Sequence, residues 1–172
     1  SNPLVLGSLT LPAYTLGIFV SDTFCYVANH SQGLRIISVA DPNNPYELGS
    51  YNTTGTAYDV TVADTLAIVA DGNTGIIILN VKEPTNPILI GSYNTPGIAS
   101  GIDYNGYLHL SDRPSGIGII DITDPASPDS VGWYNTPGSA YQSRCYNSHL
   151  FVADGSSGLR VLDCADPGNI AE

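Results

Sequence analysis

The chain has 172 residues, with five basic and sixteen acidic side chains and a formal net charge of −11. An acidic excess of this size repels phosphate backbones and anionic lipids, which argues against a nucleic-acid partner or a membrane-surface role. No apolar run approaches the roughly 18 residues that a membrane-spanning helix needs, so we expect no membrane insertion by this segment. The sequence has no methionine and begins Ser1-Asn2-Pro3 without a signal-peptide pattern, so we expect a piece excised from a longer polypeptide.

A motif of an acidic residue followed by proline occurs four times at regular spacing along the chain. It begins at Asp41, Glu83, Asp124 and Asp166, at spacings of 42, 41 and 42 residues. An apolar run around a glycine follows the first three copies, and the same run opens the chain: Leu-Val-Leu-Gly-Ser at 4–8, Glu-Leu-Gly-Ser-Tyr at 47–51, Leu-Ile-Gly-Ser-Tyr at 89–93 and Ser-Val-Gly-Trp-Tyr at 130–134. A period near 42 residues is typical of propellers and solenoids. We therefore predict one domain over 1–172, with repeat units at about 1–40, 41–82, 83–123 and 124–165, and with 166–172 starting a further repeat.

Each repeat contains four short runs rich in Val, Ile and Tyr, bounded by Gly, Pro, Asn and Asp. Counted from Tyr58 in the second unit, these runs are near 58–63, 66–70, 75–80 and 88–93, and no helix-length amphipathic segment separates them. The pattern predicts four antiparallel strands per unit. The fold class is therefore all-β, a β-propeller of four-stranded antiparallel blades, whereas a β-helix would need parallel coils and a shorter period.

The two ends of the chain bear on how the ring closes. The chain begins with the fourth strand of a unit, at 3–9, and its last complete strand is the third of a unit, at 159–164. We expect the N-terminal strand to complete the last blade and close a ring of four. Two alternatives stay open: the chain is part of a longer ring, or two chains join as a homodimer with eight blades.

The end of each repeat has a characteristic sequence motif. The phrases Val-Ala-Asp-Gly at 69–72 with Gly-Ile-Ile-Ile-Leu-Asn-Val at 75–81, and Phe-Val-Ala-Asp-Gly at 151–155 with Leu-Arg-Val-Leu-Asp at 159–163, resemble the LVIVD repeat. The linking phrases Asp-Pro-x-x-Pro, Leu-Gly-Ser-Tyr and Asn-Thr-Pro-Gly are similar to it as well. The resemblance covers essentially the whole chain and implies a β-propeller from a bacterial or archaeal surface or secreted protein, with no shared catalytic residues. The first unit departs most, with Thr10-Leu11-Pro12-Ala13 in place of Asn-Thr-Pro-Gly and Asn29 in place of Asp.

Positions that differ between the repeats are candidates for function, because scaffold residues should recur and a grafted site should not. The middle of the first strand holds Phe19, Thr61, Asp103 and Arg144 in the four units. Asp103 and Arg144 have opposite charges in adjacent blades, so we interpret them as an ion pair across the blades. The alternative is a polar ligand site in the central channel.

The starts of the first strands and the turns between the second and third strands lie on one face of a propeller. Tyr58-Asp59 and Tyr141-Gln142 come from the inner loops of that face. Aromatic rings beside carboxylates and amides suit a sugar or a peptide. The candidate ligand-binding residues are Tyr58, Asp59, Tyr141, Gln142, Asp103 and Arg144. In the alternative interpretation the tyrosines pack between blades, and Asp or Asn caps its own turn.

No cofactor, metal site or catalytic residue is expected from the motifs. The turns at 71–75 and 154–158 lack the ligand spacing and distal glutamate of a calcium loop. Cys25, Cys145 and Cys164 fall at small apolar strand positions, which favours buried free thiols over a disulfide or a nucleophile. His30, His109 and His149 show no metal-ligand spacing, so we expect strand histidines with satisfied hydrogen bonds.

These observations favour a non-enzymatic extracellular or cell-surface propeller module from a prokaryote that presents its loops to a protein or glycan. The rival hypothesis is a carbohydrate-active enzyme that uses Asp59, Asp71 or Asp103 as acid and base. The binding hypothesis requires that Tyr14, Tyr58 and Tyr141 are not buried between blades.

Overall fold

The computed structural model describes residues 2–172, which form four antiparallel sheets. The first sheet contains β1 (Gly17–Ser21), β2 (Phe24–Ala28), β3 (Leu34–Ser38) and β4 (Tyr46–Tyr51), and the second contains β5 (Asp59–Ala63), β6 (Leu66–Ala70), β7 (Ile76–Asn80) and β8 (Ile88–Tyr93). The third contains β9 (Ile98–Asn105), β10 (Tyr107–Arg113), β11 (Gly116–Asp121) and β12 (Asp129–Tyr134). The fourth has only β13 (Gln142–Tyr146), β14 (His149–Ala153) and β15 (Leu159–Asp163). The strands predicted for the second unit are confirmed to within a residue at each end.

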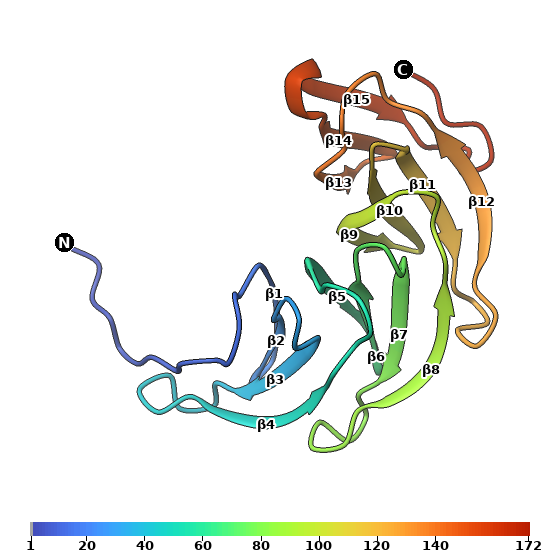
Figure 1. The fold of residues 1–172 in the computed structure, drawn as a ribbon. Helices are drawn as coiled ribbons and strands as arrows, with labels where there is room; N and C mark the ends of the chain where they lie inside the picture. Colours follow the sequence, from blue (N-terminus) through green and yellow to red (C-terminus); the bar gives the residue numbers. More distant parts are fainter. Residues whose placement is uncertain (1) are drawn as a thin grey trace.

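The sheets are arranged as the blades of a propeller (Figure 1). The first strand of each blade is innermost, where β5 contacts β1 and β9, and β9 contacts β13. β4, β8 and β12 form the outside of the arc (Figure 1). The only helical element in the described part of the chain is the three-residue 3-10 turn η1 (Gly155–Ser157), so that part contains no helix able to cross a membrane.

The core lies between neighbouring blades because the inner strands bury both of their faces. On β7, Ile77 and Leu79 pack against the first blade, while Ile76 and Ile78 pack against the third. This two-sided burial explains the unbroken Ile-Ile-Ile-Leu run, because successive side chains of a strand point to opposite faces. Each fully buried aliphatic side chain stabilises the stack by about 1.5–3 kcal/mol.

The ring closure predicted from the sequence is not formed in this structure. Residues 2–16 belong to no strand, and within the described part of the chain the outer edge of β15 pairs only at the bridge between Asp163 and Ala171. Figure 1 shows the four blades as an open arc, with the N-terminal segment directed away from the last blade. The last blade therefore has three strands instead of the expected four.

The N-terminal segment instead lies against the first blade. A Cβ added at Gly7 would be 2.4 Å from the carbonyl oxygen of Pro42. The glycines of the three outer strands lie equally close to the corresponding carbonyls, with Gly49 against Pro84, Gly91 against Pro125 and Gly132 against Pro167. Residues 3–9 thus occupy the place of an outer strand that precedes the first blade. The later units follow the same arrangement: each repeat unit defined on the sequence begins with the outer strand of one blade and continues with the three inner strands of the next.

Candidate functional site: an aromatic row on the loop face

Five side chains form a continuous row across the loop face, and we call it the aromatic row: Tyr14, His30, Tyr58, Arg113 and Tyr141. Its first contacts are between rings, at centroid distances of 5.9 Å for Tyr14 and His30 and 6.5 Å for His30 and Tyr58. The Arg113 guanidinium then lies between two rings, 5.0 Å from the centroid of Tyr58 and 4.7 Å from that of Tyr141. The row therefore joins side chains from all four blades.

An alternation of large and small residues makes room for the row. The turn between the second and third strands of each blade has His30, Gly72, Arg113 and Gly155 at equivalent positions. A Cβ at Gly72 would lie 3.2 Å from the Tyr58 ring, and one at Gly155 would lie 3.3 Å from the Tyr141 ring. The two glycines therefore let the tyrosine rings lie over their own turns, while the other two blades place His30 and Arg113 beside those rings.

The row faces solvent. Tyr14 is 77% exposed and Tyr141 is 49% exposed, while Tyr58 and Arg113 are half-buried. The condition set by the binding hypothesis is thus met, because none of these three tyrosines is buried between blades. A cation over an aromatic face contributes about 0.5–1 kcal/mol when exposed and about 2 kcal/mol when shielded from water.

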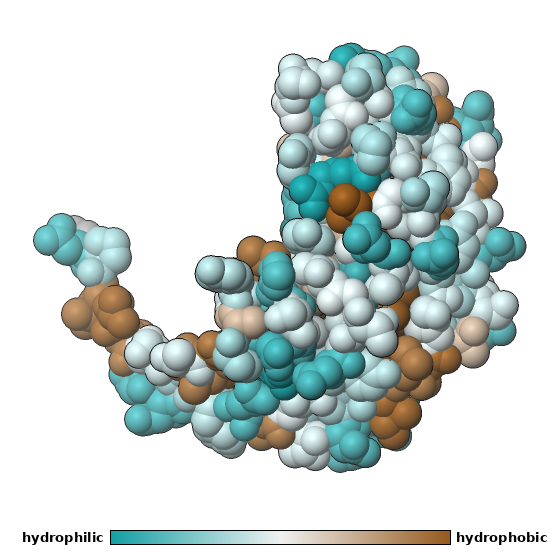
Figure 2. Space-filling view, viewed as in Figure 1, coloured by the Kyte–Doolittle hydropathy of each residue, from teal (hydrophilic) through white to brown (hydrophobic). Residues whose placement is uncertain are grey.

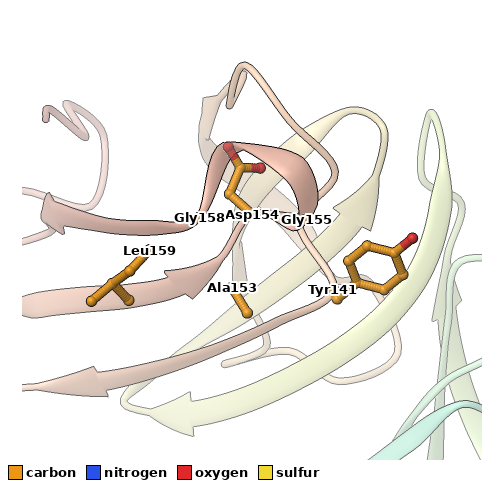
Figure 3. A pocket seen from close by; sticks show the side chains of 6 residues that line it. All are labelled: Tyr141, Ala153, Asp154, Gly155, Gly158 and Leu159. Atoms are coloured by element: carbon orange, nitrogen blue, oxygen red, sulfur yellow. The ribbon is translucent and has the colours of Figure 1, made fainter.

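An open hollow lies at each end of the row. One has a volume of about 520 Å³ and is lined by Leu11, Pro12, Ala13, Tyr14, His30 and Ser31. The other, in Figure 3, has a volume of about 390 Å³ and is lined by Tyr141, Ala153, Asp154, Gly155, Gly158 and Leu159. Both volumes are in the range of sites for small molecules or single sugar residues.

Asp59 and Gln142, two of the predicted ligand residues, hold blades together. The Oδ2 atom of Asp59 accepts hydrogen bonds from the Ile102 amide at 3.1 Å and from Gln142 Nε2 at 2.9 Å. Its Oδ1 atom accepts a bond from the Val60 amide at 2.9 Å. The buried Asp59 carboxylate thus connects three blades.

The ion pair predicted between Asp103 and Arg144 is absent among the described residues, so that interpretation is wrong. Arg144 Nη1 donates to the carbonyl oxygens of Ile102 at 3.0 Å and Ser143 at 2.9 Å. Asp103 Oδ2 accepts a bond from the Cys145 amide at 2.8 Å. Each group pairs with the backbone between β9 and β13, and neither belongs to the row.

The recurring aspartates at the end of the second strands cap the loop that enters the same blade. Asp154 accepts bonds from Thr136 Oγ1 at 2.6 Å and from the Gly138 amide at 3.0 Å. Asp71 and Asp112 accept bonds from the same threonine and glycine positions of their own blades. This explains why the Asn-Thr-Pro-Gly phrase and the aspartate recur together.

The first blade reverses this hydrogen bond. Asn29 replaces the aspartate, and its Nδ2 donates to the carbonyl oxygen of Ala13 at 2.8 Å, whereas the glycine amide is the donor in the other blades. The two departures noted in the first repeat thus compensate for one another. Ala13, the acceptor, directly precedes Tyr14, the first residue of the row.

The histidines and cysteines differ in part from expectation. His30 lies in a turn and not in a strand, and the buried His109 has no hydrogen-bond partner for Nδ1 within residues 2–172. Cys25 is buried, while Cys145 and Cys164 are partly exposed, and Cys164 lies just beyond β15. Burial, followed by the neighbouring Cys145 thiol, raises the pKa of Cys164 to about 12, which makes it a poor nucleophile.

Tyr14, His30 and Arg113 belong to the row but are not among the ligand residues predicted from the sequence. The repeat pattern places His30 and Arg113 on the loop face, and the signal that sets them apart is their replacement of glycine in alternate blades. Reading that signal requires knowing that the equivalent glycine lies beneath a tyrosine ring, which the sequence does not specify.

Four blades built from four sequence repeats define this chain as a β-propeller repeat protein. It belongs to the LVIVD repeat family, whose repeat matches residues 13–53, 54–95, 96–136 and 137–172. Its fold is similar to the crystal structure of the computationally designed Ika4 protein, with a TM-score of 0.73 and 5% identity over 94% of this chain and 98% of that one. It is also similar to the computationally designed Ika8 protein, with a TM-score of 0.72 and 6% identity over 90% of this chain and 47% of that one. Such low identities show the fold alone, and no curated protein matches the chain.

Proposed function

We propose that this propeller is a non-enzymatic binding module that takes a glycan along the aromatic row, on the outside of a prokaryotic cell. The observation that carries this proposal is the unbroken row from Tyr14 to Tyr141, with exposed rings and an open hollow at each end. A row that spans four blades suits an extended chain of units better than a single small molecule.

The chemistry of the row favours a glycan over other ligands. The C–H faces of a sugar ring stack on exposed tyrosines, while its hydroxyls accept hydrogen bonds from cationic donors. Arg113 supplies such donors at the centre of the row. A nucleic acid would meet a net charge of −11, which disfavours it.

The hydrogen bonds of the carboxylates support binding without catalysis. Asp59, Asp71 and Asp103 each accept hydrogen bonds from backbone amides or from hydroxyls within the fold. A glycosidase requires two carboxyl groups that reach the scissile bond. The carboxylates named in the rival hypothesis are engaged in holding loops and blades.

The extracellular location rests on two supports. The repeat family implies surface or secreted proteins, and an acidic chain with five basic residues is compatible with an exposed, soluble module. Location is tested by fractionating prokaryotic cells that express the protein; its recovery from the cytosol alone would contradict the proposal.

The binding proposal is tested by applying the purified chain to an array of oligosaccharides. We expect retention on at least one glycan class, loss of at least tenfold in affinity for Tyr141→Ala, and no change for Tyr146→Ala. Tyr146 is a matched control because it is 68% exposed at the opposite end of β13. Absence of any bound glycan, or equal affinity of both variants, would overturn the proposal. Retention of a protein ligand alone would assign the row to protein contact instead.

A further inference from the structure

Three potential metal ligands converge between the third and fourth blades, away from the aromatic row. His109 comes from β10, Cys145 from β13, and Cys164 from the segment after β15. One ligand atom from each residue lies within 4.8 Å of those of the other two, and the two sulfur atoms are 3.7 Å apart. These residues are separated along the chain and have no motif spacing, so only the fold brings them together.

The three residues replace apolar packing at the other blade interfaces. The equivalent positions at the first interface hold Tyr26, Val62 and Val81, which pack in one apolar cluster. Ile68, Tyr104 and Ile122 hold these positions at the second interface, and both isoleucines are in its core. Three independent departures from the repeat thus meet at one point, as expected for a grafted site and not for scaffold.

The polar surroundings also indicate a ligand. His109 is 4% exposed, and its Nδ1 atom lacks a hydrogen-bond partner within residues 2–172. A buried polar atom without a partner destabilises the folded state unless something binds it. Asn105 Nδ2 lies 3.6 Å from the Cys145 sulfur, and Asp103 accepts the Cys145 amide, so the neighbouring groups orient one thiol.

We propose that His109, Cys145 and Cys164 form a binding site for a thiophilic metal ion, with Zn²⁺ as the ion that fits best. Imidazole and thiolate are the ligands that zinc prefers, and tetrahedral zinc with Zn–S bonds of about 2.3 Å places two sulfurs about 3.8 Å apart. The observed sulfur separation of 3.7 Å is close to that value. Binding releases the thiol protons to solvent, and water fills the fourth position.

The test uses the fully reduced, metal-free chain and Co²⁺ as a spectroscopic probe. We expect thiolate-to-cobalt charge-transfer absorption and the visible bands of a tetrahedral site, saturating at one equivalent. Zn²⁺ should displace the cobalt and raise the melting temperature. Absence of the charge-transfer absorption in the reduced protein would overturn the proposal.

Variants that restore the repeat assign the ligands. Cys164→Val and His109→Ile introduce the residues found at equivalent positions, Val81 and Ile68. Each new side chain is therefore one that already packs in the core of another blade interface. We expect each variant to weaken Zn²⁺ binding by at least about 100-fold. Cys25→Ala is the matched control, since Cys25 lies in a separate cluster and Ala67 is its equivalent. Unchanged affinity in Cys164→Val and His109→Ile, or an equal loss in Cys25→Ala, would contradict the assignment.

The same cysteines could instead pair as a disulfide, and the experiment distinguishes the two outcomes. Intact mass of the chain purified without reductant would then be lower by two hydrogens. If that oxidised form is found and the reduced form binds no cobalt, the metal proposal fails. If the reduced form binds cobalt with the expected spectrum, the site stands.

Discussion

The guanidinium of Arg113 lies over the ring of Tyr141, 4.7 Å from its centroid, and the two residues belong to neighbouring blades. The same guanidinium contacts Tyr58 of a third blade. One cation therefore joins the aromatic side chains of the second and fourth blades into a continuous surface. Its position depends on the glycines that replace it in those two blades.

Replacing Arg113 with Gly, the residue at 72 and 155, should weaken glycan binding about 10-fold or more, because it removes the charged hydrogen-bond donor at the centre of the row. The variant also loses the cation–π contacts with Tyr58 and Tyr141, so its melting temperature should fall by a few degrees. Titration calorimetry with a glycan retained on the array gives the affinity. Lys82→Ala in an exposed loop serves as control, and an affinity for the glycine variant equal to wild type would count against the role of Arg113.

Thr136→Val should destabilise the fold by about 1–3 kcal/mol. The change removes the hydroxyl that donates to the buried Asp154 carboxylate and leaves one of its oxygens without that partner. Urea denaturation measures the loss. Thr123→Val, at an exposed loop position, should be neutral; comparable losses in both variants would show that the cap contributes nothing specific.

Gly91→Ala should lower the free energy of unfolding by about 1–3 kcal/mol or more. The new methyl group would clash with the Pro125 carbonyl oxygen and push the outer strand away from the next blade. The matched control is Gly168→Ala, whose Cβ would find its nearest neighbour 3.6 Å away. Thermal unfolding of both variants checks the difference. If the two variants unfold at the same temperature, the contact between the strand glycine and the proline carbonyl is not important for stability.

Asp112 should make the fold less stable as pH rises through its titration. Burial raises the pKa of this carboxyl, although hydrogen bonds from Thr95 and Gly97 act to lower it. Between the unfolded and the folded pKa, the folded chain holds a proton that the unfolded chain has released, so the free energy of unfolding falls with increasing pH. Below that interval the penalty is absent, and above it the penalty is complete.

Asp112→Asn isolates this effect because asparagine does not titrate. The stability of wild type minus that of the variant should decrease between about pH 3 and pH 7, measured by urea denaturation. A difference that increases over the same range would mean that the fold stabilises the charged carboxylate, contrary to the burial argument.

The N-terminal segment should promote self-association. Leu4 and Val5 are more than 80% exposed, and Figure 2 shows the apolar patch of this segment projecting from the body. Residues 3–9 already lie where an outer strand lies, and β15 offers an edge that lacks one. We expect light scattering to give twice the 18.0 kDa of one chain, and deletion of 1–9 to restore the single-chain mass. If the full chain and the deletion variant both have the mass of one chain, residues 3–9 do not pair with β15 of a second chain.

Much of the fold could be predicted from the sequence because the sequence pattern of each strand recurs in every repeat. The run at 76–79 identifies a strand buried on both faces, and the prolines and glycines mark its limits. Closure could not be predicted in the same way. Whether residues 3–9 reach β15 depends on the curvature of the arc, which is set by the packing of whole blades.

The site was predictable only in part, for a related reason. Tyr58 and Tyr141 were found because they precede inner strands on the predicted loop face. Asp103 and Arg144 look like an ion pair in a repeat alignment, yet backbone donors and acceptors between β9 and β13 satisfy them separately. A repeat alignment gives equivalent positions but not the direction in which a long side chain points.

The most direct test of binding along the aromatic row is an amide chemical-shift map of the isotope-labelled chain, titrated with an oligosaccharide retained on the array. The account predicts that the largest shifts include those of Tyr14, His30, Tyr58, Arg113 and Tyr141 and reach into the two flanking hollows. Shifts confined to the outer strands β4, β8 and β12, with the row unperturbed, would contradict it.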